Sequence, residues 1–167
     1  WPQGRAARCR PGEGENGGRA GPGRAVTRYL GVDYGTKRVG LAISDGLGVT
    51  ARPLQVVARS AVVERVRELH EEYTVTKMVV GLPTGLAGQE GVSAVGARAL
   101  GDELSAATGI PVEYLDERFT SKLAEDALLQ SGMKRRQRRV TVDKVAAAII
   151  LQDYLNIRAA NGNHEAD

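Results

Sequence analysis

Acidic residues end two apolar segments of this 167-residue chain, and they are its first candidates for catalysis. Asp33 ends the segment YLGVD, and Asp116 and Glu117 end the segment VEYLDE. If both segments are parallel strands of one sheet, their carboxyl ends open into the same crevice. Successive side chains of a strand point to opposite faces, so only one of Asp116 and Glu117 can face that crevice. The sequence leaves both of them open.

A third acidic candidate is Asp143, near the start of a helix predicted over residues 141–157. Ala147 and Ile150 follow it on a small, apolar stripe that would face a sheet. A carboxylate on that side must be paired or coordinated, because burial of an unpartnered charge is very costly. Two interpretations of Asp143 stay open: an acid stabilised by the helix dipole or a salt bridge, or a metal ligand.

Cys9 is the only cysteine, which excludes an internal disulfide and any multi-thiolate zinc or iron–sulfur site, and the wide separation of His70 and His164 argues against a histidine-rich metal site. Carboxylate oxygens suit Mg²⁺ or Mn²⁺, which also bind waters and substrate phosphates. Two such ions about 4 Å apart would activate a water and stabilise the leaving oxygen of a phosphodiester. The candidate ligands are Asp33, Asp116, Glu117 and Asp143, and phosphodiester hydrolysis is the predicted chemistry.

The elements that must position these acids form a regular series. Alternating apolar residues and Gly turns predict strands at 29–33, 38–44 and 50–57, in an antiparallel meander. There follow a helix with Ser60 as its N-cap, strands at 78–82 and 112–116, and helices at 92–107, 120–129 and 141–157. This order predicts an α/β fold with a five-stranded mixed sheet, three antiparallel strands and then two parallel ones, flanked by helices. Asp45 ends a strand of opposite direction, so we expect it at the other edge of the sheet.

The composition describes one domain, with 42% apolar and 26% charged residues. Residues 1–28 are rich in Gly and Arg and nearly without apolar side chains, so we expect a disordered tail there. We expect the folded domain at 29–158 and a polar tail at 159–167. A run of about 18 apolar residues and a leader are both absent, which predicts a cytoplasmic protein without a membrane partner.

The net charge of +3 is unevenly divided, since residues 1–28 carry +4 and residues 29–167 carry −1. One dense basic run stands before Asp143, and its members are Lys134, Arg135, Arg136, Arg138 and Arg139. We expect this run to be a loop that binds phosphates, and the alternative is a solvated connector. Lys37, Arg38 and Arg118 are further candidates for phosphate contacts, against the alternative of exposed cations without a role.

Four motifs occur in one order along the chain: GVDYGTKRVG at 31–40, VGLP at 80–83, DERFT at 116–120, and VDKVAA at 142–147 followed by ILQ at 150–152. Together they resemble the YqgF/RuvX family, Holliday-junction-resolvase-like nucleases of the ribonuclease H superfamily. The match runs from about residue 29 to residue 157. Any one motif alone would be weak, but four in the right order are specific.

The resemblance implies a ribonuclease H-like fold and a bacterial-type cytoplasmic nuclease that matures the 5′ end of the 16S ribosomal RNA precursor. Asp33 matches the first catalytic acid of the family, Glu117 or its neighbour Asp116 the second, and Asp143 the third. The wider superfamily has an acid at the end of the fourth strand, where this chain has Gly81-Leu82-Pro83-Thr84. The number of metal ions therefore stays open, as does the choice between Mg²⁺ and Mn²⁺.

Two other functions stay open. The first is a catalytically silent factor that binds nucleic acid and assists assembly of the small ribosomal subunit. The second is an actin-like ATPase or sugar kinase, because the segment DYGT at 33–36 also resembles their phosphate hairpin. Those enzymes enclose the nucleotide between two such lobes, and this chain holds one.

The choice between branched DNA and RNA as the substrate depends on whether the protein forms a two-fold dimer. Resolution of a branched DNA junction needs a two-fold dimer with a large apolar, self-complementary face. The helix stripes here are just wide enough to cover the sheet, and the other helix faces are charged. We therefore predict a monomer that cuts single-stranded RNA or the 5′ extension of a ribosomal RNA precursor, with a junction resolvase as the alternative.

Overall fold

The computed structural model describes residues 26–83, 91–117 and 135–162, with side chains from Val145 onward in the last range. The helix predicted at 120–129, together with Arg118, Lys134 and residues 1–25, lies outside the described residues.

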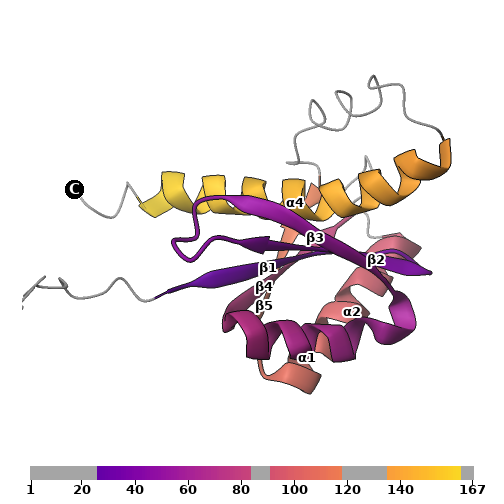
Figure 1. The fold of residues 1–167 in the computed structure, drawn as a ribbon, viewed down its shortest axis with the longest axis horizontal. Coiled ribbons are helices and arrows are strands. Elements are labelled where there is room, and N and C mark those ends of the chain that lie inside the picture. Colours follow the sequence, from indigo (N-terminus) through magenta and orange to yellow (C-terminus); the bar gives the residue numbers. More distant parts are fainter. Residues whose placement is uncertain (1–25, 84–90, 118–134, 163–167) are drawn as a thin grey trace, which may run out of the picture.

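The sheet has the predicted mixed topology. Its strands are β1 (Arg28–Asp33), β2 (Arg38–Ser44), β3 (Ala51–Ala58), β4 (Val75–Leu82) and β5 (Val112–Asp116), in the spatial order β3-β2-β1-β4-β5. The pairs β1–β2 and β2–β3 are antiparallel, whereas β1–β4 and β4–β5 are parallel. The carboxyl ends of β1, β4 and β5 therefore share one edge of the sheet (Figure 1).

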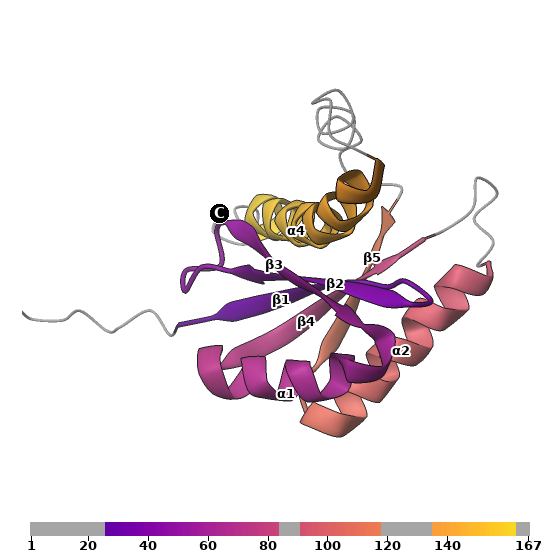
Figure 2. The same ribbon diagram turned by 45° about the vertical axis from the view of Figure 1, so that its right-hand side comes forward.

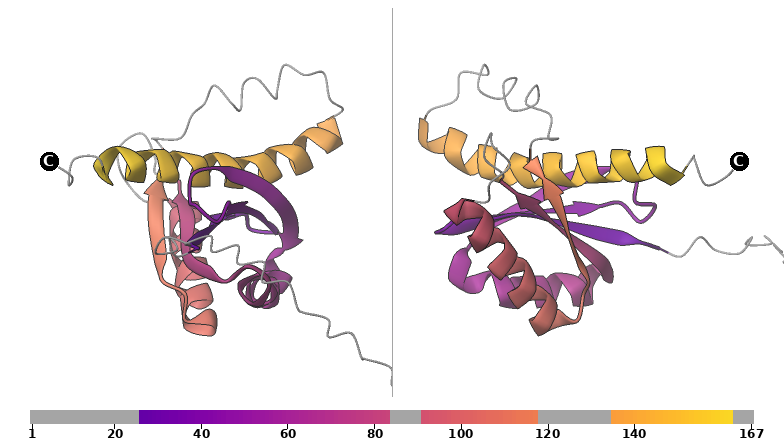
Figure 3. Two further views of the ribbon diagram at one scale, coloured as in Figure 1. Left: turned by 60° about the vertical axis from the view of Figure 1, so that its left-hand side comes forward. Right: turned by 180° about the vertical axis from the view of Figure 1, so that it is seen from behind.

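Helices cover both faces of this sheet. A short 3₁₀ turn, η1 (Arg59–Ala61), leads into α1 (Val62–Tyr73), and α1 and α2 (Val92–Thr108) lie on one face. The long helix α4 (Arg135–Gly162) crosses the opposite face (Figures 2 and 3). None of the helices in the described ranges has the length and apolar character needed to span a membrane.

Each face has its own buried cluster. The cluster under α1 and α2 contains large aliphatic side chains, among them Leu30, Leu41, Leu69, Met78, Leu100 and Leu104, all fully buried. The cluster under α4 is smaller and includes Tyr29, Ala42, Val79, Ala147, Ile150 and Leu151. Alternation along the strands sends neighbouring residues into different clusters, as Leu30 and Tyr29 show.

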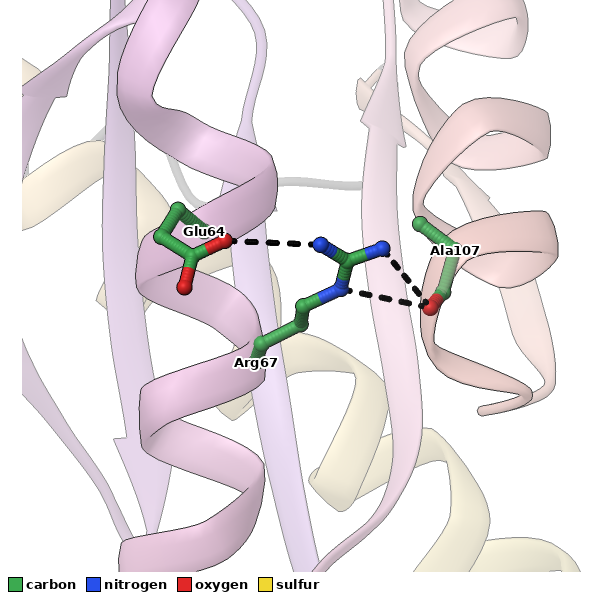
Figure 4. A network of polar contacts seen from close by, with 3 residues as sticks. All are labelled: Glu64, Arg67 and Ala107. Atoms are coloured by element: carbon green, nitrogen blue, oxygen red, sulfur yellow. Dashed lines mark hydrogen bonds and ion pairs between the residues drawn. The ribbon is translucent and has the colours of Figure 1, made fainter.

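The helices α1 and α2 are also joined at the surface. The guanidinium of Arg67 lies between the Glu64 carboxylate, at 3.4 Å, and the backbone carbonyl of Ala107, to which Nε and Nη2 donate at 3.4 and 3.5 Å (Figure 4). Ala107 is in the last turn of α2, where carbonyls lack helical partners and a cation is favourable. This contact links the end of α2 to the side of α1.

The predicted N-cap of α1 is wrong. Ala61, not Ser60, holds the N-cap position, and no side chain caps the helix there. The backbone N–H of Arg59 donates to the carbonyl of Lys37 at 2.9 Å, so η1 is attached to the β1–β2 hairpin before the helix begins. This contact between distant segments has no local signal in the sequence.

The last helix is longer at both ends than predicted. The expectation of a loop is wrong for Arg135, Arg136, Arg138 and Arg139, because α4 begins at Arg135. Arg and Gln are good helix formers, and the sequence between Gly132 and Gly162 contains neither Gly nor Pro. No residue of the basic run therefore stops a helix. At its other end α4 continues past residue 158 to Gly162.

Candidate active site

Asp33 ends β1 on the face that α4 covers. Two residues earlier, a Cβ on Gly31 would lie 2.7 Å from the backbone oxygen of Ala147 and 2.8 Å from the Cβ of Leu151, both in α4. Alternation gives Asp33 the same face as Gly31. The next residue, Tyr34, packs on the other side of the sheet, against Gly96 of α2. The Asp33 side chain, half-buried, thus lies at the carboxyl edge, toward α4.

Glu117 reaches the same region from the end of β5. Its Oε1 lies 2.9 Å from the point where a Cβ on Gly81 would be. Gly81 is in β4, the strand between β1 and β5. Val32 pairs with Val80, so Asp33 and Gly81 are the next residues along these two neighbouring strands. The Glu117 carboxylate therefore lies over β4, about one strand spacing, roughly 5 Å, from the strand that carries Asp33.

Asp116 points elsewhere. It follows Leu115, which belongs to the cluster under α4, and Tyr114, which packs on the face of α2. Alternation therefore gives Asp116 the face of Tyr114. The structure brings Glu117, and not Asp116, to the side of the sheet where Asp33 lies.

Asp143 lies in α4, but its side chain is outside the described part of the molecule. The course of the helix is informative nevertheless. Ala147 packs over Gly31, whereas the guanidinium carbon of Arg158, further along α4, lies 5.3 Å from the ring centre of Tyr29. The helix therefore runs antiparallel to β1, and its residues before Ala147 lie toward the carboxyl edge that holds Asp33.

A shallow pocket opens beside Asp33, at the β1–β2 hairpin. It is lined by Asp33, Tyr34, Gly35, Thr36, Lys37, Arg38 and Gly40. Both Lys37 and Arg38 are exposed residues of this lining. The arrangement combines one carboxylate with two cations within a single turn, which suits an anionic ligand that also carries a metal ion.

Asp45 has a structural role, as its position predicts. In the turn between β2 and β3, Val49 and Thr50 donate backbone N–H groups to its Oδ1 at 2.8 and 3.4 Å. The hydrogen bond from Val49 is the main reason that the pKa of Asp45 is lowered. This turn lies at the end of β2 away from the hairpin that holds the pocket.

Two side chains of α4 attach this helix to the sheet by hydrogen bonds that the sequence does not predict. Gln152 accepts a hydrogen bond from the backbone N–H of Ala51 at 2.8 Å and donates to the carbonyl of Val49 at 3.0 Å. On the other side, the Tyr154 hydroxyl donates to Glu113, which also pairs with Lys77 at 2.5 Å. The Lys77 hydrogen bond is the main reason that the pKa of Glu113 is lowered. Polar residues in a helix gave no indication of these partners.

The RuvX family model, described as Holliday junction resolvase, matches residues 27–157. The chain belongs to the RuvX family. Relatives named pre-16S rRNA nuclease include a Lactococcus lactis subsp. lactis protein, 42% identical over 137 residues, which cover 79% of this chain and 96% of the relative. Another, from Anaeromyxobacter sp. strain Fw109-5, is 46% identical over 136 residues, covering 80% and 99%.

Among solved structures, Thermus thermophilus RuvC in complex with a Holliday junction substrate aligns with a TM-score of 0.52 and 16% identity, over 80% of this chain and 96% of that one. At this identity the likeness shows the fold alone. It confirms the ribonuclease H-like fold that the motifs of this RuvX-family chain predict.

The donors of the RuvX-family site fit a hard divalent cation. The described carboxylates at the edge, Asp33 and Glu117, supply only oxygen atoms, and Mg²⁺ is commonly bound by one or two carboxylates with waters and substrate phosphates. Within the described ranges, no group of three His, Cys, Asp or Glu side chains comes together. A third protein ligand would have to come from a side chain outside them, and Asp143 is the candidate by its place in α4.

Proposed function

We propose that this RuvX-family chain is a divalent-metal-dependent endonuclease that matures the 5′ end of the 16S ribosomal RNA precursor. The observation that carries the proposal is the position of Glu117 over β4, beside the strand that ends in Asp33. The names of the relatives support the substrate. Its partner would be the pre-ribosomal small subunit, in the cytoplasm.

Asp33, Glu117 and Asp143 are the proposed metal-binding and catalytic residues, and strand alternation favours Glu117 over Asp116. A bound Mg²⁺ or Mn²⁺ would supply an activated water and neutralise charge on the phosphate. The protein residues hold their carboxylates in fixed places on a rigid sheet edge. That pre-organisation supports catalysis because the ligands need not rearrange during the reaction.

The cations are proposed to hold the phosphates of the substrate. Lys37 and Arg38 line the pocket next to Asp33, so they are placed to contact the phosphate that is cut or its neighbour. Arg118 follows Glu117 directly in the sequence. The basic run, Lys134, Arg135, Arg136, Arg138 and Arg139, precedes Asp143 in the sequence, and its cations would contact the nucleic-acid backbone without reading bases.

A branched DNA junction is the second candidate substrate, because the matching family model is described as Holliday junction resolvase. A resolvase would need a stable dimer. The exposed side of α1 instead carries ion pairs within the helix, Arg65 with Glu68 at 2.6 Å and Arg67 with Glu64 at 3.4 Å. A charged surface of this kind is a poor self-complementary interface, which supports the monomer.

A cleavage panel tests the proposal. The full chain is incubated with a 16S precursor 5′ extension, an unstructured RNA and a four-way DNA junction, each with Mg²⁺, Mn²⁺ or a chelator. We expect metal-dependent cuts in the RNA substrates, and none by Asp33→Asn, which keeps the shape of the side chain but removes its charge. Symmetric junction cleavage by a dimer would favour the resolvase, and no cleavage under any condition would favour the silent assembly factor.

A further inference from the structure

Gly81 lies where three elements of the candidate site meet. It is buried near the carboxyl end of β4, between β1 and β5. A Cβ at this position would lie 2.5 Å from Cδ1 of Ile150 in α4 and 2.9 Å from Oε1 of Glu117. Both distances are below any ordinary carbon contact, so an alanine would have to displace one neighbour or both.

Backbone conformation does not explain the glycine. Among the described residues, the glycines with positive φ are Gly48 and Gly109, so the backbone of Gly81 is in a region open to any residue. The reason for a glycine at position 81 is the space above β4 that a side chain would fill.

We propose that Gly81 is a positioning residue for the metal site, because its missing side chain leaves the place over β4 that the Glu117 carboxylate occupies. This inference rests on the proposed function. The reason is distance: neighbouring strands are about 4.8 Å apart, so the ends of β1 and β5 are separated by roughly 10 Å. Two ligands of one Mg²⁺ each lie about 2.1 Å from the ion, so an acid on β5 can share an ion with Asp33 only if it reaches across β4.

The length of the Glu117 side chain also matters. An acid that ends β5 needs the extra methylene of glutamate, compared with aspartate, to bring its oxygen atoms over the neighbouring strand. A side chain on β4 would fill that path. The Glu117 side chain is therefore long enough to reach over β4, and the missing side chain of Gly81 leaves the space for its carboxylate.

Four variants separate positioning from packing: Gly81→Ala, Ile150→Val, the double variant Gly81→Ala/Ile150→Val, and Glu117→Asp. The valine removes Cδ1 of Ile150, the nearest atom to the new methyl group, and leaves Glu117 untouched. The readouts are urea unfolding without metal, the rise in melting temperature on addition of Mn²⁺, and cleavage of the RNA substrates.

We expect the double variant to regain the metal-free stability of Ile150→Val. Its Mn²⁺-induced rise in melting temperature should nevertheless fall by at least about half. Its cleavage rate should fall by about 100-fold, which is the loss that a displacement of about 1 Å can cause. Glu117→Asp should fold like the wild type and lose the Mn²⁺ effect to the same extent. A double variant that is restored in both stability and Mn²⁺ response would overturn the proposal, and so would a normal Mn²⁺ response in Glu117→Asp.

The Mn²⁺ readout also separates this inference from the proposed function. If the wild type responds to Mn²⁺ but cuts no nucleic acid, the nuclease proposal fails, and the variants still decide the role of Gly81. If the wild type shows no Mn²⁺ response, both proposals are overturned.

Discussion

The two faces of the sheet are packed in different ways. Under α1 and α2, Leu30, Met78, Leu100 and other large side chains fill the space between helix and strand. Under α4, close contact occurs at Gly31, where the backbone of Ala147 would touch an added Cβ. The cluster under α4 also contains large side chains such as Leu151 and Leu155, but the small residues Gly31 and Ala147 let the helix approach the sheet closely. The larger buried cluster thus lies on one face of the sheet, and the proposed metal site lies on the other.

The largest effect should come from Asp143→Asn, which tests whether the site extends onto α4. If Asp143 is a metal ligand, cleavage should fall by at least about 10³-fold, or about 4 kcal/mol in the barrier. Stability should stay equal or rise, since one charge leaves a cluster of carboxylates. Cleavage assays and urea unfolding of the same preparation measure both. Lower stability with normal activity would instead identify an acid held in a structural salt bridge, because α4 begins at Arg135 and Asp143 is too far from the helix start for a dipole effect.

A substitution on the other face should do the opposite. Leu100→Ala removes a fully buried side chain of α2 and should cost about 2–5 kcal/mol in the free energy of unfolding. Activity per folded molecule should change little. Ile157→Ala is the control, because Ile157 is 42% exposed and its loss should cost far less. A loss of activity at full folding would show that the two faces are coupled.

The attachment of α4 to the β2–β3 turn is weaker. Gln152→Ala removes the hydrogen bonds to Ala51 and Val49 and should lower the free energy of unfolding by about 1–2 kcal/mol. Asn156→Ala, which loses only a 3.1 Å contact with Gln152, is the matched control. Equal effects of the two changes in urea unfolding would contradict the role of Gln152 in holding the helix.

The pocket cations should affect binding and leave the fold unchanged. The double variant Lys37→Gln/Arg38→Gln should weaken binding of every RNA sequence alike and reduce the slope of log affinity against log salt by about 0.7 for each lost contact. Fluorescence anisotropy at several salt concentrations measures this slope. The control is Arg65→Gln on α1, the helix on the face of the sheet that α4 does not cover. This substitution should leave the slope unchanged.

The smallest effect is expected at Asp45, on the turn remote from the site. Its folded pKa is lowered, so its contribution to stability is present above the unfolded aspartate pKa of about 3.9 and is lost as the pH falls through the folded value. Asp45→Asn should therefore reduce stability at pH 7 and have little effect near pH 2, with metal-dependent cleavage intact. An equal cost at both pH values would show that the carboxylate charge is irrelevant to the turn.

Local patterns were enough to predict the sheet. The bounds predicted for β2 and β5 agree with the structure, β1 begins one residue earlier and β3 is shifted by one residue, because alternation and turn residues act over a few neighbouring positions. The strand predicted at 78–82 is β4, which begins three residues earlier, at Val75. The same local rules fail at the start of α4, because they predict a loop for a basic run that contains no helix breaker and that continues the helix from Arg135.

The sequence by itself determined which acids are available, and it placed Asp33 and the pair Asp116 and Glu117 at strand ends. It placed Asp143 near the start of a helix, whereas α4 begins eight residues earlier, at Arg135. Only the tertiary structure decided between Asp116 and Glu117 for the face of Asp33, because that choice depends on which cluster Leu115 joins. Only the structure placed the Glu117 carboxylate over Gly81, 2.9 Å from the position of an added Cβ. Both decisions depend on contacts between β4, β5 and α4, and residues so far apart along the chain leave no mark in local periodicity or spacing.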